Sequence, residues 1–259
     1  MPIRVSARTD PQGPVKGKTA PRESPRQAFK PSGPVLRGSV LLDLHNHTYH
    51  SPDSHVAPED LVARARRKGL GGLAVTDHNS VRGIQEAEAA AGPDFVIIPA
   101  TEVSTRSGHV LAYGVRREIP RDLSVAETVE RIVALGGVPV AAHPYRFWSG
   151  LGEPAVFEAP FPAFETCNSR TLRRGNARAA ETARERKVGQ TGGSDSHFLD
   201  EVARAVTVVN GGVLRVDDVL QALGQGKTSA RGIDRGAAAT ARYVTKCVGE
   251  WILRGMRRI

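Results

Sequence analysis

The chain has 259 residues, of which 40% are hydrophobic and 24% are charged, a composition typical of a globular protein with one main core. No stretch approaches the ~18 consecutive apolar residues of a membrane span, and the N-terminus lacks the apolar segment of a secretory signal. The two cysteines, Cys167 and Cys247, are too widely spaced to suggest a disulfide framework or a thiolate zinc site. We therefore expect a cytoplasmic protein.

The net charge of +9 is concentrated at the two ends of the chain. Residues 1–38 carry a net +6 and seven of the 17 prolines, residues 226–259 carry another +6, and residues 39–225 carry −3. We expect 1–38 to be a disordered basic tail and 226–259 to be a basic extension with an amphipathic helix over 237–259. Either end is a candidate to contact nucleic acid or an anionic membrane surface, which would make the protein peripheral to a membrane; the helix could equally pack on the main domain.

Short apolar runs alternate with helix-like segments through residues 39–225, the predicted main domain. The runs are VLLDLHNH, GLAVTDH, FVIIPATEV, HVLAYGV, VPVAAHP, FPAFETCN, VGQTGGSD and AVTVVN, and the helical segments are 58–68, 80–91, 124–135 and 171–187. Continuous apolar runs are typical of strands buried on both faces, and their alternation with helices predicts an α/β fold with a mainly parallel sheet. About seven strand–helix units fit, which is short for an eight-fold barrel.

Polar motifs follow the downstream ends of these apolar runs. Because the carboxyl ends of parallel strands meet at one face of an α/β fold, we expect the motif side chains to converge. The predicted ligands are imidazoles and carboxylates, namely His45, His47, Asp53, His78, Glu102, His109, His143, Asp195 and His197. Nine ligands are too many for one ion, so the set predicts two to three divalent ions. A donor set without thiolates favours Mn²⁺, Fe²⁺ or Zn²⁺ over Mg²⁺ or Ca²⁺.

The motifs together resemble those of the PHP family, named for its polymerase and histidinol phosphatase members. They are DLHNHTYHSPDS (43–54), GLAVTDHN (72–79), TEVS (101–104), GHVLAYG (108–114), AAHP (141–144) and GGSDSH (192–197). The resemblance covers roughly residues 40–210 and implies a distorted (β/α)7 barrel with a trinuclear metal centre. It suggests one ion at His45, His47, Glu102 and Asp195, a second at Asp53, His78 and His197, and a third at Glu102, His109 and His143.

The predicted function is hydrolysis of phosphoesters by attack of a metal-bound hydroxide, with no protein nucleophile assigned. The expected substrate is a phosphorylated small molecule, a nucleotide or an oligonucleotide. Arg146 and Arg170 are candidates to bind its phosphate, because a guanidinium group matches phosphate oxygens. Two alternatives remain at this point. One is a nucleic-acid-binding or membrane-tethered module whose metal site is mainly structural, and the other is a metal-dependent amidohydrolase.

Overall fold

The structure is a computed structural model that describes residues 38–211 and 215–233, with isolated positions 245, 248, 249, 252 and 255 beyond them. The predicted tail lies outside the described residues except for Gly38, and so does the predicted C-terminal helix apart from those isolated positions. The proposed domain limits at 38/39 and 225/226 therefore stay predictions. Among the described residues, no helix is long and apolar enough to cross a membrane.

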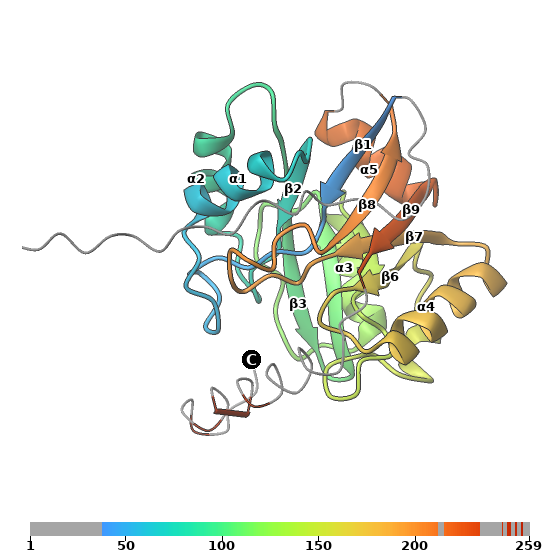
Figure 1. Ribbon diagram of the computed structural model, residues 1–259. Helices are drawn as coiled ribbons and strands as arrows, with labels where there is room; N and C mark the ends of the chain where they lie inside the picture. The colour runs from blue at the N-terminus through green and yellow to red at the C-terminus, as the bar shows by residue number, and fades with distance from the viewer. Residues whose placement is uncertain are drawn as a thin grey trace, which may run out of the picture.

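In the described part of the chain, the strands form one nine-stranded sheet in the order β7-β6-β5-β4-β3-β2-β1-β8-β9. The strands are β1 (Ser39–Asp43), β2 (Gly72–Val75), β3 (Val96–Thr105), β4 (Gly108–Tyr113), β5 (Val138–Ala141), β6 (Ala163–Asn168), β7 (Gly189–Gly193), β8 (Ala205–Asn210) and β9 (Thr228–Gly232). The helices are α1 (Pro58–Arg67), α2 (Gly83–Ala91), α3 (Val125–Ala134), α4 (Arg173–Glu185) and α5 (Val216–Gly224), with a 3₁₀ turn η1 at Ala155–Phe157. Helices α1 and α2 lie together on one side of the sheet, beside β2, and α4 lies on another side, beside β6 (Figure 1).

The sheet curls until β7 meets β8, so that it is a nearly closed barrel. The Gly192 N–H donates to Thr207 Oγ1 at 2.9 Å, and that hydroxyl donates to the Gly192 carbonyl at 2.9 Å. A Cβ at Gly192 would lie 2.4 Å from the Val206 carbonyl oxygen, so only glycine permits this approach. The predicted α/β barrel is confirmed, and the eight predicted apolar runs correspond to β1 through β8.

Two strands, β4 and β8, depart from the parallel arrangement that the alternating pattern favours. β4 pairs antiparallel with β3 and β5, while β8 pairs antiparallel with β1 and β9. Only Arg106 and Ser107 separate β3 from β4, which is enough for a hairpin but far too short for a parallel crossover. Neither α5 nor β9 was predicted. β9 is an edge strand that pairs only with β8 among the described strands, and its sequence, TSARG, contains no apolar run that would indicate a strand.

The interior of the barrel is apolar at one end. Leu42, Ile98, Leu111 and Tyr113 are completely buried there, and α5 packs on the same cluster through its apolar face. Two further apolar clusters lie outside the sheet, one beneath α1 and α2 and the other around α3. This packing leaves the opposite end of the barrel interior, at the carboxyl ends of β1, β2, β5, β6 and β7, for polar side chains.

Candidate metal centre

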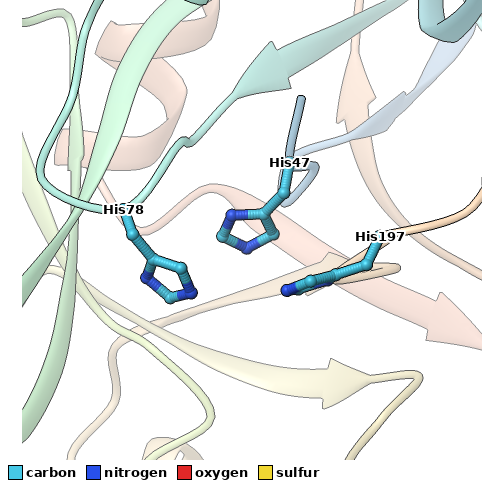
Figure 2. A group of neighbouring side chains, drawn as sticks. All are labelled: His47, His78 and His197. Carbon is cyan, nitrogen blue, oxygen red and sulfur yellow. The ribbon is translucent and has the colours of Figure 1, made fainter. Parts of the chain in front are cut away.

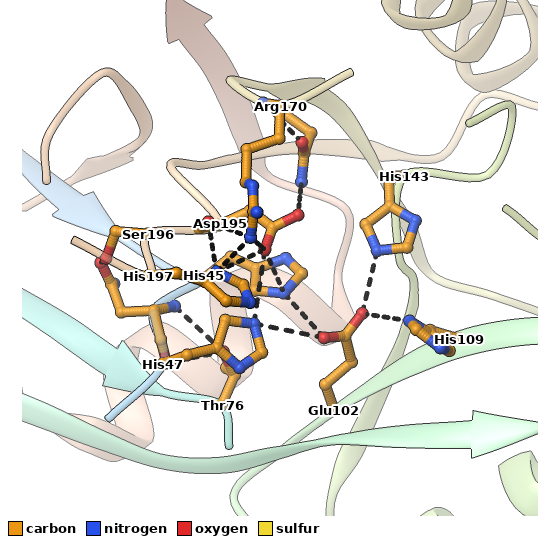
Figure 3. Close-up of polar contacts among 12 residues, drawn as sticks. His45, His47, Thr76, Glu102, His109, His143, Arg170, Asp195, Ser196 and His197 are labelled. Atoms are coloured by element: carbon orange, nitrogen blue, oxygen red, sulfur yellow. Dashed lines mark hydrogen bonds and ion pairs between the residues drawn. The ribbon is translucent and has the colours of Figure 1, made fainter. Parts of the chain in front are cut away.

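The predicted ligands come from six strands, or from the turns and the loop that follow them, at one end of the barrel. Figure 3 shows most of them. His45 and His47 follow β1, Asp53 lies in the next loop, His78 follows β2, His143 follows β5, and Asp195 and His197 follow β7. Glu102 lies within β3, and His109 lies at the start of β4. Because β4 is antiparallel, with His109 paired to Ser104, its first residues reach the same end as the last residues of β3. The expected convergence therefore includes an antiparallel strand.

Glu102 lies at the centre of this cluster. Among the described residues, five imidazole nitrogens approach its carboxylate: His78 Nδ1 at 3.2 Å, His45 Nε2 at 3.1 Å and His47 Nε2 at 3.3 Å from Oε2, with His109 Nδ1 at 2.7 Å and His143 Nε2 at 2.9 Å from Oε1. A carboxylate offers about four lone-pair positions, so five imidazoles cannot all donate a hydrogen bond to it. The two oxygens thus divide the histidines into one set of three and one set of two.

Several buried polar atoms in the cluster have no hydrogen-bond partner among the described residues. They are His47 Nε2, His78 Nδ1, His143 Nδ1 and Asp53 Oδ1. The rings of His47, His78 and His197 face a common space, with centroids 4.5 Å apart for His47 and His78 and 4.3 Å for His47 and His197 (Figure 2). Buried polar atoms are nearly always satisfied in folded proteins, so four unsatisfied atoms within one cluster of histidines and carboxylates fit a site for cations.

Asp195 forms a second focus of the cluster, on the side where the two candidate phosphate-binding arginines lie. Its Oδ1 lies 3.4 Å from His47 Nε2 and 3.6 Å from Arg170 Nη1, and its Oδ2 accepts a hydrogen bond from Arg146 Nη2. Arg170 also contacts His197 through its Nη1. Both predicted phosphate-binding residues are therefore at the cluster, where they compensate part of the charge of Asp195.

Asp53 reaches the cluster because its loop folds back on itself. The Tyr49 N–H donates to the Val56 carbonyl at 2.9 Å, and Ser54 Oγ donates to the His47 carbonyl at 3.0 Å. This places Asp53 Oδ2 2.7 Å from His197 Nε2 and 3.8 Å from His78 Nε2. All nine residues predicted as ligands thus lie in one connected group, and their roles as ligands stay a prediction. The other two histidines, His50 beside Glu86 and the exposed His55, lie outside it.

The pKa values of the imidazoles in the cluster are shifted in opposite directions. Burial lowers the pKa of His47, but the neighbouring carboxylates of Asp195 and Glu102 outweigh burial and raise the pKa to about 9. Burial dominates at His78 and His143, lowering the pKa of His78 to about 3 and, together with Arg146, that of His143 to about 4. A neutral imidazole is the form that binds a metal ion, so His78 and His143 are already in the ligand form.

Burial alone raises the pKa of the two central carboxyl groups, yet their neighbours reverse this effect. His109, His45 and His78 hold the pKa of Glu102 well below its ordinary value. Arg146 and His45 do the same for Asp195. Both groups are therefore carboxylates in an almost completely buried position, where a negative charge requires positive charge nearby. Divalent ions among neutral imidazoles would meet that requirement.

Two buried residues of the site, Glu165 and Asn168, both on β6, were not predicted from the sequence. Glu165 Oε1 lies 2.9 Å from His45 Nδ1, and its Oε2 accepts the His143 backbone N–H at 2.8 Å. Asn168 Nδ2 donates to Glu165 Oε2 at 3.1 Å and to Asp195 Oδ2 at 3.2 Å, while its Oδ1 accepts from Arg146 Nη2 at 2.7 Å. For Asn168 the available signal was its position at the end of the apolar run FPAFETCN, the same position that identified other ligands, whereas Glu165 lies inside that run.

Backbone conformation at the site is unusual at two of the candidate ligands. His143 has φ 27° and Asp195 has φ 52°, in the left-handed region that residues with a side chain rarely adopt. The Asp195 N–H donates to the His45 carbonyl at 2.7 Å, and the Glu165 carboxylate holds the His143 N–H. Such conformations persist where surrounding contacts enforce them, and they concentrate at functional sites.

Comparison with known proteins identifies the family. Residues 43–119 match the family model described as PHP domain, and residues 173–228 match the model described as PHP-associated. The chain belongs to the PHP family. An uncharacterized protein of Methanocaldococcus jannaschii is 33% identical over 144 residues, covering 50% of this chain and 82% of that relative. The PHP resemblance read from the sequence is thereby confirmed.

Two further similarities concern proteins with a described activity. The 5′-3′ exoribonuclease Rnm of Salmonella typhimurium is 40% identical over 70 residues, which cover 26% of this chain and only 24% of that enzyme. Among solved structures, a two-domain protein from Bacteroides vulgatus, described as containing a predicted PHP-like metal-dependent phosphoesterase, superimposes with a TM-score of 0.65. The identity is 19%, and the match covers 81% of this chain and 70% of that one, so the likeness shows a shared fold. The clustered histidines and carboxylates of this chain have the composition and spacing of groups that could bind metal ions.

Proposed function

We propose that the protein hydrolyses phosphoesters at a centre of three divalent ions, chosen from Mn²⁺, Fe²⁺ and Zn²⁺. The observation that carries this proposal is the carboxylate of Glu102 with histidines on both of its oxygens. His45, His47 and His78 approach Oε2, while His109 and His143 approach Oε1. A carboxylate in this position is suited to bridge two ions, and the remaining ligands are enough for a third.

The ligand atoms fall into four overlapping groups, which supports the proposal of more than one ion. Within each of the following groups the atoms lie within 4.8 Å of one another: His45, His47 and Asp195; His47, His78 and His197; His78, Glu102 and His109; His45, His143 and Glu165. The first ion would be held by His45, His47, Glu102 and Asp195, the second by Asp53, His78 and His197, and the third by Glu102, His109 and His143. In this assignment Glu165 orients His45 through its Nδ1, as a carboxylate commonly does for a ligating histidine.

Bound divalent ions would supply a nucleophile from water at neutral pH and neutralise the charge of a phosphoester oxygen. The protein's own side chains have two other tasks. Arg146 and Arg170 already flank Asp195, and their guanidinium groups offer several N–H donors with the geometry that phosphate oxygens match. The Asn168 amide orients Arg146 and Asp195 together, so that the guanidinium group is fixed before substrate binds.

The substrate class that we propose is a nucleotide or an oligonucleotide, with phosphorylated small molecules as the second choice. The similarity to an exoribonuclease supports the first class, although it extends over only 24% of that enzyme. The proposed mechanism uses hydroxide derived from water as the nucleophile, so it requires no covalent intermediate.

A phosphoester panel tests this function. The purified protein, reconstituted with Mn²⁺, is offered small phosphate esters, nucleotides and phosphorylated oligonucleotides, together with a set of amides. We expect turnover of at least one phosphoester, and we expect His78→Ala and Asp195→Ala to abolish it. His55→Ala serves as the matched control, since His55 is exposed and outside the cluster. Full activity in metal-free wild-type protein, or turnover of amides alone, would contradict the proposal.

A further inference from the structure

Two large aromatic side chains lie exposed beside the candidate metal centre. Phe147 is 93% exposed and Trp148 is 57% exposed, and their rings pack edge to face with centroids 5.9 Å apart. Isolated apolar residues are common on protein surfaces, but adjacent aromatic rings at the rim of a site are typical of a binding surface. Since they are so exposed, these rings add little to the stability of the fold. We call residues 146–150 the aromatic turn.

The aromatic turn is held in place by backbone contacts on both of its sides. The Arg146 N–H donates to the His143 carbonyl at 2.9 Å, and the Gly150 N–H donates to the Arg146 carbonyl at 3.1 Å. On the other side, a Cβ at Gly108 would lie 2.7 Å from the Gly150 carbonyl, so the turn packs directly on the start of β4. His109 is the next residue of that strand. The exposed rings therefore sit on a turn fixed to two candidate ligands, His143 and His109.

Arg146 connects the aromatic turn to the interior of the site. Its side chain points inward, where it contacts Asp195, donates to Asn168 Oδ1 at 2.7 Å and donates to Thr171 Oγ1 at 3.3 Å. Phe147 follows it in the chain and points outward, with its Cα about 3.8 Å from that of Arg146. The aromatic pair thus begins one residue beyond a side chain that touches the cluster. A substrate group adjoining a phosphate bound at the cluster would lie within reach of these rings.

The surface beside the aromatic turn is basic. The first turn of α4 packs against it, because a Cβ at Gly175 would lie 2.9 Å from the Tyr145 carbonyl oxygen. Arg173 and Arg174 are exposed in this first helical turn. Arg178, one turn farther along, lies over the Tyr145 ring at 4.4 Å and forms an ion pair with Glu153. Aromatic rings interleaved with arginines are the combination that binds single-stranded nucleic acid, through base stacking and phosphate contacts.

We propose that Phe147 and Trp148 form a stacking platform for the base next to the scissile phosphate of a single-stranded oligonucleotide. Because the two rings are perpendicular, one ring stacks on the face of the base and the other contacts its edge. This inference rests on the proposed phosphoesterase function and deepens it by naming the substrate class. Stacking accepts any base, because every base has a flat face, so the platform would select for nucleic acid without selecting for sequence. A phosphoester without a base would reach the metal ligands but would make no contact with the platform.

The test measures binding first, independently of hydrolysis. The probe is a short, fluorescently labelled, 5′-phosphorylated single-stranded oligonucleotide, compared with a matched probe that lacks the base at the 5′-terminal nucleotide. Fluorescence anisotropy is recorded with the full chain in ~0.15 M salt and without added metal, so that contacts from the basic ends are partly screened and no turnover occurs. The variants are Phe147→Ala, Trp148→Ala and the conservative Trp148→Phe. Phe157→Ala is the control, because Phe157 is also an exposed aromatic residue but packs under Arg186 at the far end of α4.

We expect Phe147→Ala and Trp148→Ala each to weaken binding of the complete probe about tenfold, the size of effect that loss of one stacking ring produces. Trp148→Phe and Phe157→Ala should bind like wild type, and the abasic probe should bind all proteins equally weakly.

Equal binding of the two probes by wild type, or unchanged binding by both alanine variants, would overturn the platform. If phosphoester hydrolysis is observed in the panel while the platform variants bind normally, the platform fails and the proposed function stands. If the platform binds as expected but nothing is hydrolysed, the proposed function fails.

Discussion

The two ends of the barrel interior are built from the same strands but carry opposite kinds of side chain. Along β3, Ile98 and Ala100 belong to the apolar cluster, and Glu102, two residues farther on the same face, is the centre of the ionisable one. β4 runs the other way, so the order reverses and His109 precedes Leu111 and Tyr113. Along β3, a distance of only two residues therefore separates the apolar cluster, which stabilises the barrel, from the ionisable cluster, which we propose for catalysis.

This difference has an energetic consequence. Burial of apolar side chains stabilises the folded chain, whereas burial of ionisable groups costs free energy unless partners compensate their charge. At the apolar end, compensation is unnecessary, and the Tyr113 hydroxyl is satisfied by the Leu44 carbonyl at 2.8 Å. At the ionisable end, His47, His78 and His143 each keep a nitrogen without a hydrogen-bond partner among the described residues. Substitutions at the ionisable end should therefore change activity and metal binding, and substitutions at the apolar end should change the free energy of unfolding.

The largest expected effect is on activity, from Glu102→Gln. This substitution removes the charge that five histidines face, so we expect loss of at least one ion and a fall in kcat/KM of about 1000-fold, equivalent to ~4 kcal/mol of transition-state stabilisation. Steady-state kinetics with a substrate found in the panel provides the measurement. Glu88→Gln is the matched control, because Glu88 forms an ion pair with Arg116 on the surface. Equal activity in the two variants would show that Glu102 has no central role.

At the apolar end, Leu111→Ala should act on stability instead. Leu111 is completely buried in the barrel interior, and loss of its side chain leaves a cavity that should lower the free energy of unfolding by about 2–5 kcal/mol. Urea denaturation measures this loss. We expect the folded variant to keep its full metal content, and the exposed Val133→Ala to change the unfolding free energy by less than about 0.5 kcal/mol. A stable Leu111 variant without metal would mean that the two ends are not separable.

The fold could be predicted largely because its strands are buried on both faces. Such strands read as continuous apolar runs, and β1 through β8 were all visible in this way. The edge strand β9 was not visible, because its sequence TSARG contains no apolar run and none of its residues is fully buried. The direction of β8 was also not predictable. An apolar run looks the same for a parallel and an antiparallel strand, and no sequence signal between β7 and β8 indicates that β8 runs antiparallel to β1. Only the two-residue connection between β3 and β4 carried information on direction.

The site could be predicted where ligands come in recognisable pairs. His45 with His47 and Asp195 with His197 are spaced so that both side chains lie on one side of the chain, and each pair directly follows a strand. Glu165 was missed because a single carboxylate inside an apolar run is indistinguishable from a surface residue until the register of β6 is known. The exposed position of Phe147 was also not predictable, since composition alone favours burial of an aromatic ring.

A smaller effect is expected from Glu165→Gln. Glu165 contacts His45 Nδ1, the ring nitrogen that faces away from Glu102, and accepts a hydrogen bond from the His143 backbone N–H. Its charge should therefore orient both ligands and increase the basicity of His45. Outer carboxylates of this kind typically change metal affinity by about 10–100-fold, less than a bridging carboxylate should. Competition with a fluorescent metal indicator measures the affinity. An effect as large as that of Glu102→Gln would identify Glu165 as a ligand in its own right.

The central claim is that the ionisable end of the barrel binds three divalent ions around Glu102. The most direct measurement is the number of Mn²⁺ ions bound per chain, determined by elemental analysis after reconstitution and removal of free metal, for wild type and Glu102→Gln in parallel. The account predicts three equivalents for wild type and at most two for the variant, with both proteins folded by circular dichroism. Wild-type protein that binds one ion or none, or a Glu102→Gln variant that retains the full wild-type number, would contradict it.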